Sequence, residues 1–383
     1  EELGPIAVVN ILQSMLKTSS LERHAHWLLR KTWKSYRTPQ DLGNRSYARF
    51  NYNYGLSLLE AGYISNPVPL AEDMTNLREW KEHADQNAYE FLARSYRLTR
   101  MPAAGAQLAS VLAYRGQVGK ALAIAGAVLD EVRTGQDPIG TCDVAVASAA
   151  VYDLVQMFRA PIELLRTCLG IATDTGDEPR RAIICACLGR FLTYSGDHEE
   201  ADRFLSEAET VGRRLDLPDV DLHARAARGL WLADSAVSAK EAVRTLQKVV
   251  DNLHSQSDIP LFTKIDLAEA DGTPRVFKAR HPLLCRVLLD LNRAAMIDGH
   301  ERVMNETLDE LDELATQVFV GYCPLYYLSY AQCLLLWGKQ DAPAEVRQLI
   351  ARARVIGEQT ENPWVASAAD HLEKQVPPRT SPG

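Results

Sequence analysis

Several groups of residues in this chain have side chains that bind metal ions, but their spacing does not suit a metal site. His24 and His26 are two positions apart, so in a helix they point to different sides. His198-Glu199 begins like a zinc-protease helix, yet Asp202 stands where that pattern needs a second histidine. The sequence therefore predicts no metal centre.

Other patterns that indicate catalysis are also missing from the sequence. There is no glycine-rich phosphate loop, no G-x-S-x-G turn around a nucleophilic serine and no Cys–His pairing with a family context. Asp216, Asp219 and Asp221 surround Pro218 and could converge on a cation, but we favour their role as helix-capping residues in a loop. We therefore expect no enzyme activity, no catalytic residue and no cofactor.

The cysteine content and the hydropathy pattern predict the compartment. Seven cysteines are an odd number and lie mostly in apolar helical stretches, which indicates reduced thiols in a cytoplasmic protein. No apolar run reaches about 18 residues, so we expect no membrane span. The first residues do not have the plan of a signal peptide, and the missing initiator Met indicates a piece of a longer protein.

Charge is distributed unevenly along the chain. The net charge is -8, which argues against general nucleic-acid binding, since phosphate contacts need an excess of Lys and Arg. The stretch from Lys17 to Arg49 nevertheless carries a net charge of +6 and contains aromatic residues such as Trp27 and Tyr47. Such a mixture can bind single-stranded nucleic acid, but helix-spaced aromatic residues more often pack as core, which we favour here. A third hypothesis is that this basic stretch docks to an acidic protein surface.

A recurring pattern of small residues predicts tandem helical hairpins. It is clearest at Leu188-Gly189, Leu192, Gly196 and Ala201, and it returns around Leu108. Small or apolar residues mark the second helix of six units, and the first three steps between them are 44, 36 and 41 residues. These marker residues are Ala121, Leu165, Ala201, Ala242, Met304 and one near Val346.

Proline, glycine and capping residues support the same division into helices. Prolines fall at or just before the predicted helix starts, where a missing N–H group does no harm. Asp197 and Ser238 each precede a Glu by three residues, which predicts N-caps. Gly116 and Gly196 stand where first helices must end in a left-handed residue. We expect an all-α, right-handed solenoid.

The predicted organisation has five parts. The step from Ala242 to Met304 is about twenty residues longer than the others. The excess contains alternating apolar residues and a turn sequence, Asp271-Gly272-Thr273-Pro274. We expect a short β-hairpin there, with a loop as the alternative. The parts are an N-terminal helical cap region (1–99), repeats (100–254), the insertion (255–281), C-terminal repeats (282–372) and a disordered tail (373–383).

The pattern resembles the tetratricopeptide repeat (TPR) family. Leu188-Gly189, Leu192 and Ala201 match its Leu-Gly pair, its large apolar residue and its alanine, whereas Tyr152-Asp153 and Gly229-Leu230 depart from the pair. The forty-residue period is similar to the longer repeats in the sensory domain of maltose-regulator-type bacterial activators. The resemblance implies that the first helix of each unit lines a concave groove that binds a partner.

Transferring the groove positions of the family onto this sequence gives the candidate binding residues. Tyrosine supplies rigid contact area and arginine a planar fork for carboxylates, so this set suits peptide or carboxylate recognition. The alternative is that the side chains only pack helices together, with the charged ends in solvent. The candidates are Tyr114, Arg190, Tyr194, Trp231, Arg286, Arg293 and Gln332.

These expectations favour a scaffold or sensor module that binds a protein or a peptide inside a larger regulatory or signalling protein. One alternative is the domain of a transcription regulator that binds a small-molecule effector. Another is an enzyme subunit in which the segment 255–281 closes over the groove. We expect no membrane association, and a homodimer is left open.

Overall fold

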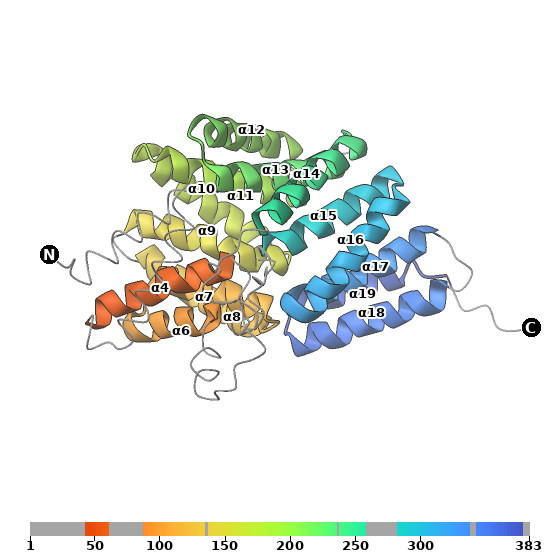
Figure 1. The fold of residues 1–383 in the computed structure, drawn as a ribbon, viewed down its shortest axis with the longest axis horizontal. Helices are drawn as coiled ribbons and strands as arrows, with labels where there is room; N and C mark the ends of the chain where they lie inside the picture. Colours follow the sequence, from red (N-terminus) through yellow and green to blue (C-terminus); the bar gives the residue numbers. More distant parts are fainter. Residues whose placement is uncertain are drawn as a thin grey trace, which may run out of the picture.

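The computed structural model describes residues 43–60, 87–134, 137–235, 237–257, 282–337 and 342–377. These residues form helices joined by short turns, and no strand occurs among them. Each helix packs against the next along the chain, and Figure 1 shows the resulting serial stack. The all-α solenoid of TPR-like hairpins predicted from the sequence is confirmed.

The repeats alternate first and second helices, preceded by the pair α4 (Asn44–Glu60) and α6 (Ala88–Thr99) and followed by α19 (Pro363–Glu373). The first helices are α7 (Pro102–Tyr114), α9 (Pro138–Leu154), α11 (Glu178–Ser195), α13 (Pro218–Asp234), α15 (Leu283–Asp298) and α17 (Cys323–Trp337). The second helices are α8 (Val118–Thr134), α10 (Arg159–Asp174), α12 (His198–Arg214), α14 (Ala239–Ser257), α16 (Glu301–Glu313) and α18 (Ala342–Gln359). A π-helical turn (Leu314–Val318) and a 3-10 turn, η2 (Val320–Tyr322), link α16 to α17.

The helix boundaries follow the signals read in the sequence. Pro102 and Pro218 occupy the first position of their helices. The carboxylate of Asp197 accepts a hydrogen bond from the amide of Glu200, three residues into α12. Gly196 ends α11 with φ of +83°, the left-handed conformation that glycine adopts without steric cost.

The small residues of the repeat pattern let the paired helices approach closely. A Cβ atom at Gly189 of α11 would collide with Leu205 of α12, and one at Gly229 would collide with Leu246 of α14. The six marker residues all lie in second helices and are 0–3% exposed, which confirms the phasing of the units. They are Ala121, Leu165, Ala201, Ala242, Met304 and Val346.

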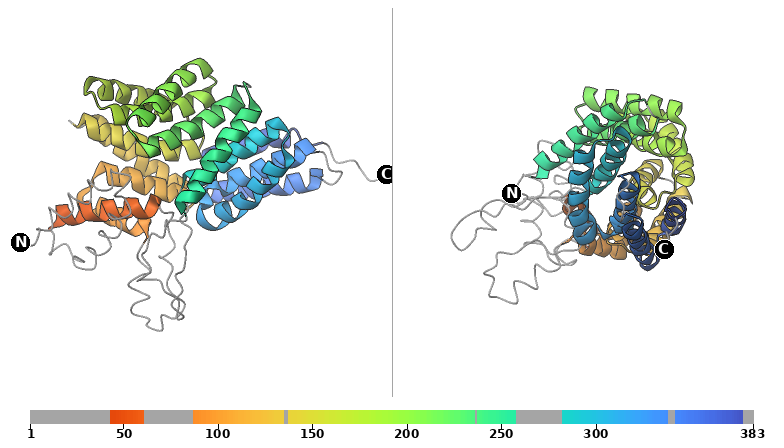
Figure 2. Two further views of the ribbon diagram at one scale, coloured as in Figure 1. Left: turned by 45° about the horizontal axis from the view of Figure 1, so that its top comes forward. Right: turned by 90° about the vertical axis from the view of Figure 1, so that its right-hand side faces the viewer.

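The stack curves until its C-terminal part meets its N-terminal part, and Figure 2 shows the helices arranged around a ring. The carbonyl of Thr360, at the α18–α19 turn, accepts hydrogen bonds from the amides of Val118 (3.1 Å) and Gly119 (3.3 Å) at the start of α8. Tyr114 of α7 stacks on Tyr322 of η2, with ring centroids 6.0 Å apart. The first helices consequently face a shared interior.

Some predicted segments lie outside the described residues. Helix α14 ends at Ser257, so residues 255–257 at the start of the predicted insertion are helical. Residues 258–281, where the β-hairpin was expected, are not described, and neither are residues 1–42 with most of the basic stretch. The predicted disordered tail overlaps the end of α19 at Glu373, and residues 378–383 lie outside the description.

Candidate functional site

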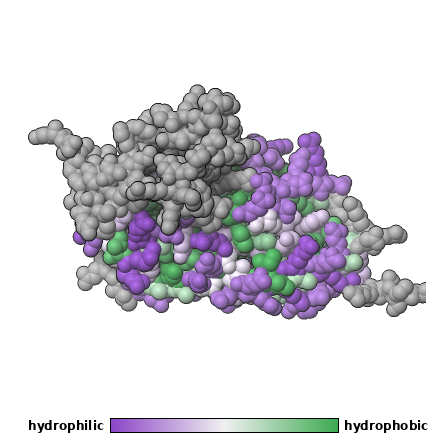
Figure 3. All heavy atoms as spheres, turned by 60° about the horizontal axis from the view of Figure 1, so that its bottom comes forward, coloured by the Kyte–Doolittle hydropathy of each residue, from purple (hydrophilic) through white to green (hydrophobic). Residues whose placement is uncertain are grey.

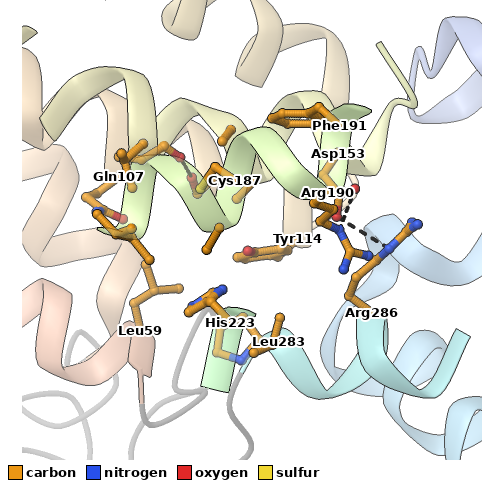
Figure 4. A pocket seen from close by; sticks show the side chains of 18 of the residues that line it. Leu59, Gln107, Tyr114, Asp153, Cys187, Arg190, Phe191, His223, Leu283 and Arg286 are labelled. Atoms are coloured by element: carbon orange, nitrogen blue, oxygen red, sulfur yellow. Dashed lines mark hydrogen bonds and ion pairs between the residues drawn. The ribbon is translucent and has the colours of Figure 1, made fainter. Parts of the chain in front are cut away.

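A cavity of about 260 Å³ lies on the interior face of the superhelix. Its walls come from α4, α7, α9, α11 and α13, from the start of α15 and from η2, so elements of both ends of the chain contribute. In Figure 4, Leu59 and Gln107 lie at one end of the cavity and Asp153, Arg190 and Arg286 at the other. Most of the wall between them consists of aliphatic and aromatic side chains. The cavity is therefore apolar with a charged end.

The charged end is a quartet of two arginines and two aspartates, which we call the Arg–Asp quartet (Asp153, Arg190, Arg286 and Asp290). Nε of Arg190 donates a hydrogen bond to Oδ1 of Asp153 (3.1 Å), and its Nη2 donates to Oδ2 of Asp290 (2.7 Å). Arg286 lies 3.4 Å from a carboxylate oxygen of each aspartate. The four side chains are only 3–12% exposed, and their formal charges cancel.

Tyr194 of α11 contacts three members of the quartet. Its hydroxyl accepts a hydrogen bond from Nη2 of Arg190 (3.0 Å) and donates one to Oδ1 of Asp290 (3.4 Å). The guanidinium of Arg286 lies 5.0 Å from the centre of the Tyr194 ring, and Phe158 stacks on the same ring at 4.6 Å. The aromatic ring therefore fixes the position of both arginines.

Burial and the charges of the quartet together set the protonation states of Arg190 and His223. Burial by itself lowers the pKa of Arg190, but the carboxylates of Asp153 and Asp290 outweigh burial and raise it above its ordinary value. Burial, reinforced by the positive charge of Arg190 and only partly opposed by Asp153, lowers the pKa of His223 to about 4. His223 of α13 is therefore a neutral imidazole at pH 7.

The remaining polar groups on the cavity wall are neutral as well. Burial and the charge of Asp153 raise the pKa of the Tyr114 hydroxyl, and burial also raises that of Tyr322. Burial raises the pKa of the Cys187 thiol to about 12. Gln107 contributes an uncharged amide. Outside the quartet, the polar groups that the described residues present to the cavity thus carry no charge at neutral pH.

A second hollow, which we call the C-terminal groove, adjoins the other side of Arg286. It has a volume of about 540 Å³ and lies between α11, α15, α17 and α19. Tyr194, Arg293 and Gln332 lie on its wall together with apolar side chains such as Leu289 and Trp364. Because Arg286 lines both the cavity and this groove, a ligand long enough to pass it can contact both.

The seven residues predicted from the sequence are distributed over these two sites, with one exception. Tyr114 and Arg190 line the cavity, and Arg286 lines both sites. Tyr194, Arg293 and Gln332 line the C-terminal groove, and Arg293 also forms an ion pair with Asp234 of α13. Trp231 lines neither site. Its indole N–H donates a hydrogen bond to the carbonyl of His198 (2.9 Å).

Sequence reasoning missed the acidic half of the quartet and, among the neutral polar groups of the cavity, Gln107 and His223. Arg286 and Asp290 stand four residues apart in the otherwise apolar stretch 283–291, and that spacing signals a buried pair on one helix face. Asp153 replaces the glycine of the Leu-Gly pair in its unit, which is the signal for that site. No comparable signal marks Gln107 or His223.

The described residues contain neither a cluster of three potential metal ligands nor a helix that could cross a membrane. Figure 3 shows one outer face, where apolar side chains form separate small groups among hydrophilic ones. The large apolar side chains that are well exposed come from different parts of the chain, for example Ile139, Val237 and Val355. The interior cavity and the C-terminal groove are therefore the better candidates for binding.

Comparison with known proteins supports the fold. No protein-family model and no curated protein matches the sequence. Among solved structures, a Rap protein complexed with competence and sporulation factor has a TM-score of 0.52, with 13% identity over 97% of each chain. TPR-like repeats of a putative kinesin light chain from Podosopora anserina have a TM-score of 0.35, with 19% identity over 56% of this chain and 97% of theirs. The chain has a TPR-like helical repeat fold.

Proposed function

We propose that this chain is a binding module that holds a segment of a protein or a peptide on the interior face of its superhelix. The observation that carries the proposal is the cavity of about 260 Å³, which is lined by successive first helices and adjoins the C-terminal groove at Arg286. An apolar chamber with a few fixed polar groups suits one large side chain of an extended ligand, and the groove accommodates the residues that follow.

The structural neighbour supports this use of the fold. The Rap protein, which aligns over 97% of both chains, is described as complexed with competence and sporulation factor. A superhelix of this kind can thus hold a ligand, and by analogy we assign regulation by a bound ligand to this chain. The similarity of the long repeats to the sensory domain of maltose-regulator-type activators points the same way.

Peptide selection and a cavity-filling variant test the proposal. Peptides selected from a random display library on the native chain are resynthesised, and their Kd is measured by fluorescence anisotropy. Ala150→Phe places a larger side chain on the cavity wall, and we expect it to weaken binding at least about tenfold, because the site for the anchoring side chain is filled. Gln107→Leu, which removes a polar group at nearly constant volume, should weaken binding less.

The matched control places the same side chain on the outside. Asp174 is exposed at the end of α10, so Asp174→Phe should leave the Kd unchanged. Circular dichroism and melting temperature show whether each variant keeps the fold. If every selected peptide binds the native chain and Ala150→Phe equally well, the cavity is not the binding site.

A small-molecule effector is the second candidate, because an apolar wall with a few fixed polar groups is typical of small-ligand sites. The cavity volume of about 260 Å³ lies just below the usual range, which begins at about 300 Å³, so such an effector would be small. In that case the C-terminal groove stays empty. Trp364→Ala removes a side chain from the wall of the groove and not from that of the cavity, so it then leaves binding unchanged, whereas an extended peptide loses affinity.

A further inference from the structure

The hydrogen-bonding capacity of the Arg–Asp quartet is unbalanced. Each guanidinium has five N–H donors. Arg190 makes hydrogen bonds to Asp153, Asp290 and Tyr194, but among the described residues Arg286 makes none, although its side chain is only 7% exposed. Nε of Arg286 is buried without a hydrogen-bond acceptor, since Asp153 at 3.4 Å gives an ion pair of unsuitable geometry. Because Nε is inaccessible, a ligand can reach only the terminal guanidinium nitrogens of Arg286, which also make no hydrogen bond to the described residues.

The charge of the quartet, in contrast, is already balanced. Arg190 and Arg286 face Asp153 and Asp290, and the other polar groups at the cavity, including His223, are neutral at pH 7. Adding a carboxylate would leave one uncompensated negative charge beside side chains that are only 3–12% exposed, which is unfavourable. Adding an uncharged acceptor would give the terminal guanidinium nitrogens of Arg286 a hydrogen-bond partner without changing the net charge.

We infer that the charged end of the cavity selects a neutral hydrogen-bond acceptor, a carbonyl flanked by an apolar side chain, and discriminates against a carboxylate. The inference rests on the proposed function, because it names the chemistry of the ligand held in the same cavity. The apolar side chain occupies the chamber beside Tyr114, and the carbonyl oxygen accepts from the guanidinium of Arg286. Arginines at such a site thus serve carbonyl rather than carboxylate recognition.

Two small probes that differ only at the acceptor test this selectivity. N-acetyl-L-leucinamide presents a neutral carbonyl at the position where N-acetyl-L-leucine presents a carboxylate. At pH 7, ligand-observed NMR titrations of the native chain should show that the amide binds at least about tenfold more tightly than the acid, because only the acid adds a charge to the balanced quartet. Equal binding, or tighter binding of the acid, overturns the inference.

Changing the charge of the quartet should reverse the preference. Asp153→Asn keeps the shape of the side chain but gives the quartet a net charge of +1, so the acid should then bind at least as tightly as the amide. Asp290→Asn makes the same change from α15 and serves if the first variant does not fold. The control, Asp202→Asn, alters a half-exposed carboxylate paired with Arg228 outside the cavity, and it should keep the native preference. An unchanged preference in both quartet variants contradicts the inference.

A third probe distinguishes a peptide segment from a small effector as the source of the carbonyl. Acetyl-Leu-Ala-Leu-Ala-amide is uncharged and long enough to pass Arg286 into the C-terminal groove. Binding at least about tenfold tighter than N-acetyl-L-leucinamide identifies a peptide, and equal binding identifies a small neutral effector; both outcomes keep the selectivity for a neutral acceptor. If none of the three probes binds, the cavity is not a ligand site, and the proposed function fails together with the inference.

Discussion

Arg190 and Asp290 stand one hundred residues apart in the sequence, and Nη2 of the arginine donates a hydrogen bond of 2.7 Å to the carboxylate of the aspartate. The bond joins α11, in the middle of the stack, to α15, which follows the long step between repeats. In an open solenoid each repeat contacts only its neighbours. Here a buried charge pair ties distant repeats together, so the shape of the interior depends on it.

Removing one partner of this pair should destabilise the chain strongly. Arg190→Leu leaves Asp153 and Asp290 facing Arg286 alone, and an uncompensated buried charge typically costs about 3–5 kcal/mol. We expect a decrease of about 3 kcal/mol in the free energy of unfolding, measured by urea denaturation. Arg203→Leu removes an arginine whose side chain is 68% exposed, and this control should cost less than about 1 kcal/mol. Similar losses in both variants would contradict the structural role of the quartet.

The buried imidazole of His223 should make stability depend on pH. Its pKa in the folded chain is lowered to about 4 from an ordinary value near 6.5, so the unfolded chain binds more protons between these values. The stability contributed by the neutral imidazole is therefore complete above pH 6.5 and is lost as the pH falls towards 4. We expect a loss of about 1–3 kcal/mol from this residue over that interval, since its ring also faces the partly solvated cavity.

Two variants separate this effect from the general acid sensitivity of the protein. His223→Gln should flatten the stability profile between pH 6.5 and 4, measured by urea denaturation at each pH. His371→Gln changes an exposed side chain and should leave the profile as in the native chain. A native profile that survives His223→Gln would show that another group is responsible.

The sequence predicts the helical units but not the quartet, and the reason is physical. The pattern around Leu188 repeats because each unit packs its neighbour in the same way, so local spacing is enough to place Ala201 and the other marker residues. Which first helices meet across the interior depends on the small rotation at every repeat, summed over the whole stack. The i, i+4 pair Arg286 and Asp290 could be recognised, but its encounter with Arg190 could not.

The contact that closes the ring can be tested with a single methyl group. A Cβ atom at Gly321 of η2 would collide with the carbonyl oxygen of Ala113 in α7. Gly321→Ala should therefore separate these segments and reduce the free energy of unfolding by about 1–3 kcal/mol. Gly170 lies within α10 with no atom near its Cβ position, so Gly170→Ala should instead stabilise by about 0.5–1 kcal/mol. An unchanged or increased stability of Gly321→Ala would show that the closure does not bear on stability.

Access to the cavity can be followed with a thiol reagent. Of the seven cysteines, six are buried and Cys187, on the cavity wall, is partly exposed. Burial raises its pKa to about 12, so very little thiolate exists at pH 7.5. Peptide mapping by mass spectrometry should show that N-ethylmaleimide modifies Cys187 first, and at least about a hundredfold more slowly than in the urea-unfolded chain. N-acetyl-L-leucinamide should slow the modification further by filling the cavity. If a buried cysteine such as Cys142 reacts before Cys187, solvent reaches the core more easily than the cavity, and the interior is not the entry route for a ligand.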